Sequence, residues 1–85
     1  MIWCVYMVEC QDTKIYTGIT TDLTRRIREH NSGRGCRFTK YRRPVRLVFF
    51  EKWPTRSAAL KREAAIKNFT RSQKMALMNQ AVVCA

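Results

Sequence analysis

The chain has 85 residues, which is enough for one domain with a small hydrophobic core and too few for a second domain. Apolar residues make up 46% of it, so the composition is typical of a folded protein and excludes a disordered one. Lys and Arg number 17 against 6 Asp and Glu, and the net charge of +11 indicates a polyanionic partner, with nucleic acid as the first candidate. The alternatives are a basic protein without such a partner and one bound to anionic lipid.

The sequence indicates neither a structural zinc site nor a membrane span. The four cysteines (Cys4, Cys10, Cys36 and Cys84) form no pair at zinc-ligand spacing, so we expect free thiols in a reducing compartment, the cytoplasm. No apolar run approaches the ~18 residues of a membrane span, and the apolar start lacks the basic region of a signal peptide. We therefore expect neither a membrane nor a small-molecule cofactor among the partners.

The first part of the chain predicts a β-hairpin. Residues 2–8 are apolar on both alternating faces, which is typical of a strand covered on both sides, and residues 15–20 are rich in β-branched and aromatic side chains. Residues 11–13 supply the turn. If this turn centres on Gln11, Tyr6 lies opposite Tyr16 with both rings on one face, whereas a slip by one residue separates them.

Helices and one more strand follow the hairpin. Asp22 is a good N-cap for a helix that ends near His30, and residues 33–44 read as a basic loop before a strand over residues 45–52. Thr55 or Ser57 can cap a helix to about Asn68, and a capping box at residues 70–73 opens a third helix to about residue 78. The order β-β-α-β-α-α predicts an α/β domain of the α+β kind, with a three-stranded sheet flanked by helices over residues 1–80 and a short tail over 81–85.

Basic side chains concentrate in one segment. Residues 25–46 hold nine of the seventeen Lys and Arg residues against one acid, Glu29, and arginine pairs well with phosphate. Phe38 and Tyr41 add rings on which unpaired bases could stack. The other interpretation is an ordinary solvated loop. The predicted nucleic-acid contacts are Arg25, Arg28, Arg34, Arg37, Lys40, Arg42 and Arg43.

Three charged or titratable residues occupy unusual places. Arg26 borders the core-facing stripe of the first helix, so it needs either a carboxylate partner or a substrate phosphate. Glu63 sits within the apolar stripe of the second helix, where backbone donors, Arg26 or a divalent cation could neutralise it. His30 could be a packed core residue, a phosphate donor or a proton carrier.

Together these residues resemble the GIY-YIG endonuclease superfamily. The resemblance rests on Val5-Tyr6, on Tyr16-Thr17-Gly18, on Asp22-Leu23 with Arg26 and His30 at their spacing, and on Glu63 in a late helix. It spans about residues 2–78 and is closest to the small stand-alone bacterial members. The first triplet, Cys4-Val5-Tyr6, keeps only the final tyrosine of the motif.

The resemblance implies a three-layer domain with an antiparallel three-stranded sheet and a metal-dependent phosphodiesterase site that acts on DNA in repair or recombination. Tyr6 and Tyr16 would line that site, and one of them would orient or deprotonate the attacking water. Arg26 would stabilise charge on the phosphate, His30 would carry a proton or bind phosphate, and Glu63 would hold Mg²⁺ or Mn²⁺. Selectivity would come from the basic loop or from a protein partner.

Two other functions remain open at this point. A non-catalytic DNA- or RNA-binding module would explain the net charge of +11 without the tyrosines. An accessory subunit would use its cysteines and the apolar residues 81–84 to contact another protein.

Overall fold

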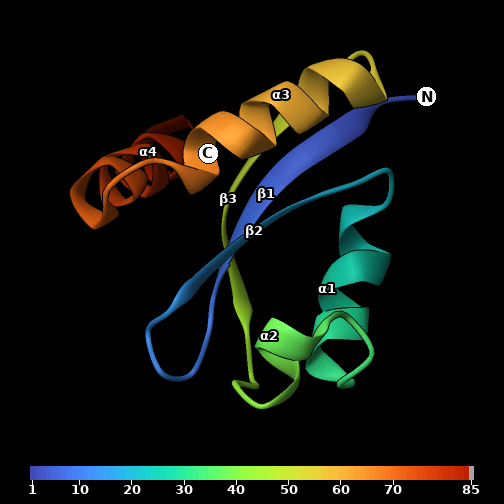
Figure 1. The fold of residues 1–85 in the computed structure, drawn as a ribbon, viewed down its shortest axis with the longest axis vertical. Coiled ribbons are helices and arrows are strands. Elements are labelled where there is room, and N and C mark those ends of the chain that lie inside the picture. Colours follow the sequence, from blue (N-terminus) through green and yellow to red (C-terminus); the bar gives the residue numbers. More distant parts are fainter. Residues whose placement is uncertain (85) are drawn as a thin grey trace.

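The computed structural model describes the backbone of residues 1–84 and the side chains of residues 1–79. The antiparallel strands β1 (Trp3–Glu9), β2 (Ile15–Thr20) and β3 (Arg46–Trp53) form one sheet in the order β2-β1-β3. Helices α1 (Leu23–Asn31) and α2 (Arg37–Lys40) lie on one side of this sheet, and α3 (Arg56–Lys67) and α4 (Arg71–Cys84) lie on the other (Figure 1). The predicted α+β fold is confirmed, with α2 as an additional helix in the segment that we expected to be a loop.

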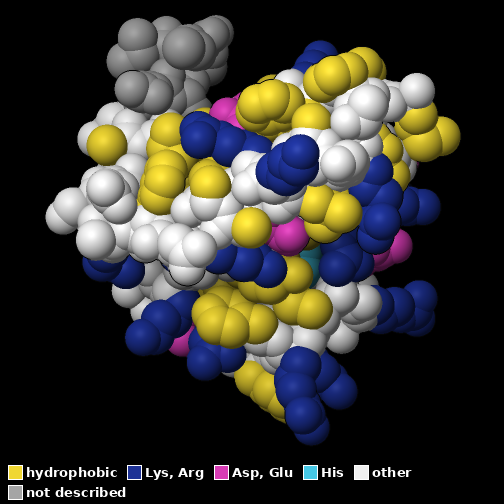
Figure 2. Space-filling view, turned by 45° about the horizontal axis from the view of Figure 1, so that its top comes forward, with side chains coloured by type: hydrophobic (Ala, Val, Ile, Leu, Met, Phe, Trp, Pro, Cys, Tyr) yellow, Lys and Arg dark blue, Asp and Glu magenta, His cyan; other side chains and the backbone are white. Residues whose placement is uncertain are grey.

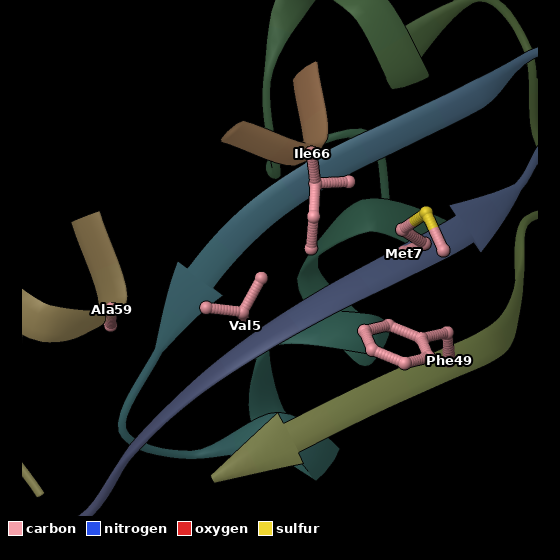
Figure 3. Packing of buried hydrophobic residues seen from close by; sticks show 5 residues of the cluster. All are labelled: Val5, Met7, Phe49, Ala59 and Ile66. Atoms are coloured by element: carbon pink, nitrogen blue, oxygen red, sulfur yellow. The ribbon is translucent and has the colours of Figure 1, made fainter. Parts of the chain in front are cut away.

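Strand β1 is the centre of two hydrophobic cores, as its apolar character on both faces predicts. On one face Val5 and Met7 pack with Phe49 of β3 and with Ala59 and Ile66 of α3 (Figure 3). The second core lies on the other face and contains Tyr6, Val8, Cys10 and Val45, with Tyr16, Leu23 and Ile27 packed against it. A residue on β1 therefore touches either the α3 side or the α1 side, and Tyr6 belongs to the α1 side.

The structure determines the register of the hairpin, which the sequence left open. Tyr6 pairs with Gly18, and Tyr16 pairs with Val8. The turn centres one residue later than Gln11 and places Thr13 at a φ of 68°, so Tyr6 is not directly opposite Tyr16 but is shifted from it by two residues. A shift by two preserves the face, so both tyrosines still lie on the same side of the sheet.

Local capping interactions define the starts of the three longer helices, as the sequence predicts. Asp22 accepts a hydrogen bond from the Arg25 amide at 3.0 Å, and Thr55 accepts one from the Ala58 amide at 3.1 Å. At the start of α4 the capping box is reciprocal: the Gln73 amide donates to Thr70 Oγ1 and the Thr70 amide donates to Gln73 Oε1.

The last helix is longer than predicted, since α4 continues to Cys84 where we expected an end near residue 78 and a separate tail over 81–85. The proposed partner contacts of residues 81–84 lie outside the described side chains. Within the described chain no helix is both long and apolar enough to cross a membrane. Cys4, Cys10 and Cys36 are free thiols, as expected.

Candidate active site and nucleic-acid interface

Four of the five predicted catalytic residues meet on the α1 side of the sheet. Tyr6 comes from the centre of β1, Tyr16 from β2, and Arg26 and His30 lie one helical turn apart on α1. The Tyr6 hydroxyl lies 2.8 Å from His30 Nε2 and accepts a hydrogen bond from Arg26 Nε at 3.3 Å. The ring centroids of Tyr16 and His30 are 5.3 Å apart. The structure thus joins β1 and α1 through hydrogen bonds and adds β2 through an aromatic contact.

His30 is held from its other side by the segment that contains α2. His30 Nδ1 lies 2.7 Å from Thr39 Oγ1, and the Thr39 hydroxyl donates to the Cys36 carbonyl at 3.4 Å. Both side chains are fully buried. Because a hydroxyl donates only once, the simplest assignment has His30 Nδ1–H donating to Thr39 and Tyr6 O–H donating to His30 Nε2. His30 is therefore both a packed core residue and the middle of a polar chain.

Two glycines make room for this centre. Gly18 lies beneath Tyr6, where an added Cβ would be 2.7 Å from Tyr6 Oη and 3.1 Å from a carbon of the Tyr16 ring. At Gly35 an added Cβ would collide with the His30 ring. The backbone approaches both aromatic side chains too closely for any side chain to fit at either position.

Arg26 is fixed by several contacts. Besides the bond to Tyr6, its Nη1 donates to Glu29 Oε1 at 2.9 Å and its Nη2 donates to the Gly35 carbonyl at 3.0 Å. The side chain remains 25% exposed. Of the two predicted partners the carboxylate is present, and the exposed part of the guanidinium still leaves a surface on which a phosphate could bind.

Burial determines the protonation of the centre. It raises the pKa of Tyr16 to about 12, with Cys36 adding to the shift, and it raises the pKa of Tyr6 although the nearby Arg26 acts in the opposite direction. Burial, assisted by the charge of Arg26, lowers the pKa of His30 to about 4. At neutral pH the free protein therefore has two neutral tyrosines and a neutral histidine. Arg26 acts to lower the pKa of Tyr6, but desolvation outweighs it.

Glu63 belongs to α3, the helix that packs on the other side of the sheet from Tyr6. Its carboxylate is close enough for its negative charge to raise the pKa of Tyr6, and its side chain is 17% exposed. Its ion-pair partner is Lys67, at 3.5 Å, and Arg26 pairs with Glu29 instead. The predicted apolar surroundings are only partly correct, since Ala59 and Ile66 are buried but Leu60 is exposed.

The donor set for a metal ion is small. Among the residues that the structure describes, no three His, Cys, Asp or Glu side chains cluster in a way that could hold a metal. A single carboxylate suits Mg²⁺ or Mn²⁺ that takes its other ligands from water and substrate phosphates. Glu63 fits that kind of site and does not fit a site built from protein ligands alone.

The predicted basic residues fall into two groups. Arg42 donates to Asp12 and to the Phe38 carbonyl, and Arg43 donates to the carbonyls of Lys40 and Asn31, so both hold the loop in place. The others are exposed, with Arg25 weakly paired to Glu29 at 3.8 Å. Figure 2 shows Lys and Arg side chains around a region where hydrophobic, acidic and histidine atoms are visible together. The exposed residues of this set are Arg25, Arg28, Arg34, Arg37, Lys40 and also Arg43.

Sequence reasoning missed Thr39 and Gly35. Both belong to a segment without helical or strand periodicity, and their roles depend on contacts with α1 that only the folded chain creates. The spacing of three residues between Cys36 and Thr39 would have suggested a local turn but not a contact with His30.

Comparison with known proteins places this geometry in a family. The GIY-YIG catalytic domain matches residues 2–76. A UPF0213 protein of Haloquadratum walsbyi is 55% identical over 76 residues, which cover 89% of this chain and 85% of that protein. A UPF0213 protein of Staphylococcus saprophyticus is 47% identical, with coverage of 89% and 93%.

Two solution NMR structures are similar as well. The UPF0213 protein of Bacillus halodurans has a TM-score of 0.61 at 40% identity, and a protein of E. faecalis has a TM-score of 0.65 at 44% identity. Each comparison covers 94% of this chain and 85% of the other. The chain therefore belongs to the GIY-YIG domain family, and its relatives are the small proteins named UPF0213.

Proposed function

We propose that this protein is a metal-dependent endonuclease that hydrolyses phosphodiester bonds in DNA. The observation that carries the proposal is the hydrogen-bonded chain from Arg26 through Tyr6 and His30 to Thr39. Membership of a family with a catalytic domain supports it, and so does the basic surface around Arg26. The finer assignment, to repair or recombination of DNA, is part of the same proposal.

Arg26 is the residue that binds the phosphate. Its guanidinium borders a cleft of about 520 Å³ that four arginines help to line (Arg25, Arg26, Arg28 and Arg34). As water attacks phosphorus and a bond to a bridging oxygen breaks, negative charge grows on the phosphate oxygens. A preoriented guanidinium stabilises that charge more than it stabilises the substrate.

The proton of the attacking water needs an acceptor. The neutral Tyr6–His30 pair can supply one, since Tyr6 can pass its proton to His30 Nε2 as it takes a proton from the water. Tyr6 is buried, so this step requires the 3.3 Å contact between Arg26 Nε and Tyr6 to open when phosphate binds, while the bonds to Glu29 and to the Gly35 carbonyl keep the guanidinium oriented. Tyr16 is only partly buried, and we assign it the orientation of the water through its hydroxyl.

Glu63 would hold Mg²⁺ or Mn²⁺ beside this centre. The ion would neutralise phosphate charge and lower the pKa of the attacking water. Since no three ligand side chains cluster among the described residues, an ion held by Glu63 would bind together with the substrate rather than before it.

The experiment compares cleavage of supercoiled plasmid and of branched DNA in Mg²⁺, Mn²⁺ or EDTA. We expect nicking that needs the metal and that falls about a hundredfold or more in Arg26→Ala. Arg62→Ala is the matched control, because Arg62 is 30% exposed and also pairs with a glutamate, but it lies on α3, where it contacts Glu51 and the Phe69 ring. Tyr16→Phe and Glu63→Ala should also lose activity.

A second function would explain a negative result. If the protein cuts neither DNA in any metal but binds both in a salt-sensitive way, it is a non-catalytic nucleic-acid-binding module with the same basic surface. Equal cleavage by wild-type protein and Arg26→Ala would contradict the assigned role of Arg26.

A further inference from the structure

The surface next to Arg26 continues into two more clefts. The cleft at Arg26 shares Arg34 with a second cleft of about 290 Å³, and the second shares Lys40 and Tyr41 with a third of about 450 Å³. The three clefts together form one path, which we call the basic track. Its basic lining beyond Arg26 consists of Arg25, Arg28, Arg34, Arg37, Lys40 and Arg43.

Tyr41 separates the last two clefts of the basic track. Its side chain is 79% exposed, while Phe38 in the same segment packs against Tyr16 and the guanidinium of Arg42. An aromatic ring that is so exposed contributes little to the hydrophobic core. Lys40 Nζ lies over the ring, 5.5 Å from its centroid. The other face of the Tyr41 ring is therefore the one available to a ligand, next to cations that can bind phosphates on either side.

The backbone around Tyr41 is held in place. Arg42 donates to Asp12 at 3.0 Å and to the Phe38 carbonyl at 2.7 Å, and the Gln11 amide donates to the Arg42 carbonyl at 2.9 Å. Arg43 donates to the Lys40 carbonyl at 3.0 Å. These bonds fix the residues before and after Tyr41, so a ligand that stacks on the ring does not have to order the loop.

We propose that Tyr41 is a stacking site for an unpaired base, and that the basic track binds a single strand of nucleic acid whose backbone leads to Arg26. An aromatic ring can stack on any base, but only on one whose face is not covered by its neighbour in a duplex. Arginine and lysine along the clefts bind the phosphates between the bases. This deepens the proposed function, because the strand that Tyr41 holds is the strand presented for cleavage.

The test measures binding in EDTA, where no cleavage takes place. Fluorescence anisotropy with a labelled short oligothymidylate gives the affinity of wild-type protein, Tyr41→Ala and Tyr41→Phe. We expect Tyr41→Ala to lose roughly tenfold or more and Tyr41→Phe to retain the affinity, since stacking needs only the ring. Binding of a duplex of the same length should be unchanged in Tyr41→Ala. Phe50→Ala, which removes a 47% exposed ring on β3, should leave both affinities as they are.

A second readout does not depend on affinity. The chain has three tyrosines, so ring-labelled tyrosine gives few signals, and those of Tyr41 should move upfield during titration with the oligothymidylate. Tyr41 signals that stay in place, or equal losses in Tyr41→Ala for single strand and duplex, would overturn the proposal.

The outcomes separate this inference from the proposed endonuclease. Binding that depends on Tyr41, without cleavage in any metal, would contradict the endonuclease and support the stacking site. Metal-dependent cleavage together with unchanged binding in Tyr41→Ala would support the endonuclease and contradict the stacking site.

Discussion

Gly18 lies directly beneath the Tyr6 ring, so that a Cβ at position 18 would be 2.7 Å from Tyr6 Oη and 2.9 Å from Cζ. The two residues are paired across β1 and β2, and the ring lies over the glycine backbone. The absence of a side chain at position 18 thus sets the position of the Tyr6 hydroxyl relative to His30 and Arg26. Gly18 matters here for the space it leaves and not for its backbone freedom.

Gly18→Ala should therefore displace Tyr6. The added methyl group forces the ring away in a fully buried environment, and such overpacking typically costs about 1–3 kcal/mol of unfolding free energy. Urea unfolding measures this loss, and nicking activity should fall as well because the Tyr6–His30 bond is strained. An unchanged stability in Gly18→Ala would show that the ring moves freely.

The hairpin shows which parts of this fold can be predicted from local sequence. Caps such as Asp22 and Thr55 act within one turn of helix, so their side chains alone predict the start of α1 and of α3. The register depends on the turn, where Thr13 adopts a positive φ that is uncommon for this residue type. Nothing in the residues around Thr13 indicates that conformation.

In the candidate site, too, some residues can be predicted from local sequence and others only from contacts in the folded chain. Arg26 and His30 can be recognised from helical spacing, and the tyrosines from strand alternation, because each signal is local. Thr39 and Gly35 are recognisable only through their contacts with His30 and Arg26 on another element. Glu63 is intermediate, since its place on α3 is predictable but its partner Lys67 was not expected.

His30 should make the stability depend on pH. Its folded pKa of about 4 is below the ordinary value of 6.5, so the unfolded chain binds more protons between these values. The stability that comes from keeping His30 neutral is present above pH 6.5 and is lost as the pH falls toward 4. One pKa unit corresponds to about 1.4 kcal/mol, so we expect a loss of a few kcal/mol over this range.

Urea unfolding between pH 5 and 7 and NMR titration of the ring check this prediction. In this window most carboxylates stay ionised, so His30→Gln should have a much weaker dependence on pH than the wild-type protein. The His30 ring signals should not titrate above pH 5. A midpoint near 6.5 would mean that Nε2 and Nδ1 reach solvent and that the buried chain of hydrogen bonds opens readily.

Thr39 should fix the tautomer of His30. With Thr39 as acceptor at 2.7 Å, the proton lies on Nδ1, and the free Nε2 faces the Tyr6 hydroxyl. Thr39→Val removes the acceptor and leaves a buried donor without a partner, which costs about 1–3 kcal/mol or moves the proton to Nε2. The ¹⁵N chemical shifts of the ring distinguish the two tautomers. We expect the Nδ1–H form in the wild-type protein and its loss in Thr39→Val.

Thr39→Ser is the matched control, because it keeps the hydroxyl and removes only a methyl group. It should retain the Nδ1–H form and most of the activity, whereas Thr39→Val should lower the cleavage rate and shift its pH profile. The assignment of donors would be reversed if the wild-type ring carried its proton on Nε2.

Glu63 should bind a divalent ion weakly in the free protein and more tightly with DNA present. It is the carboxylate that we assign to the ion, and an ion held by one carboxylate needs phosphate oxygens to complete its ligands. Mn²⁺ binding followed by water proton relaxation should therefore strengthen when a short DNA is added, and this increase should vanish in Glu63→Gln. Lys67→Ala frees the carboxylate from its 3.5 Å ion pair, so it should leave the increase intact or enlarge it.

DNA affinity in EDTA should be similar for the wild-type protein and Glu63→Gln, because the glutamine keeps the shape of the side chain. Equal Mn²⁺ binding by the two proteins in the presence of DNA would place the metal elsewhere.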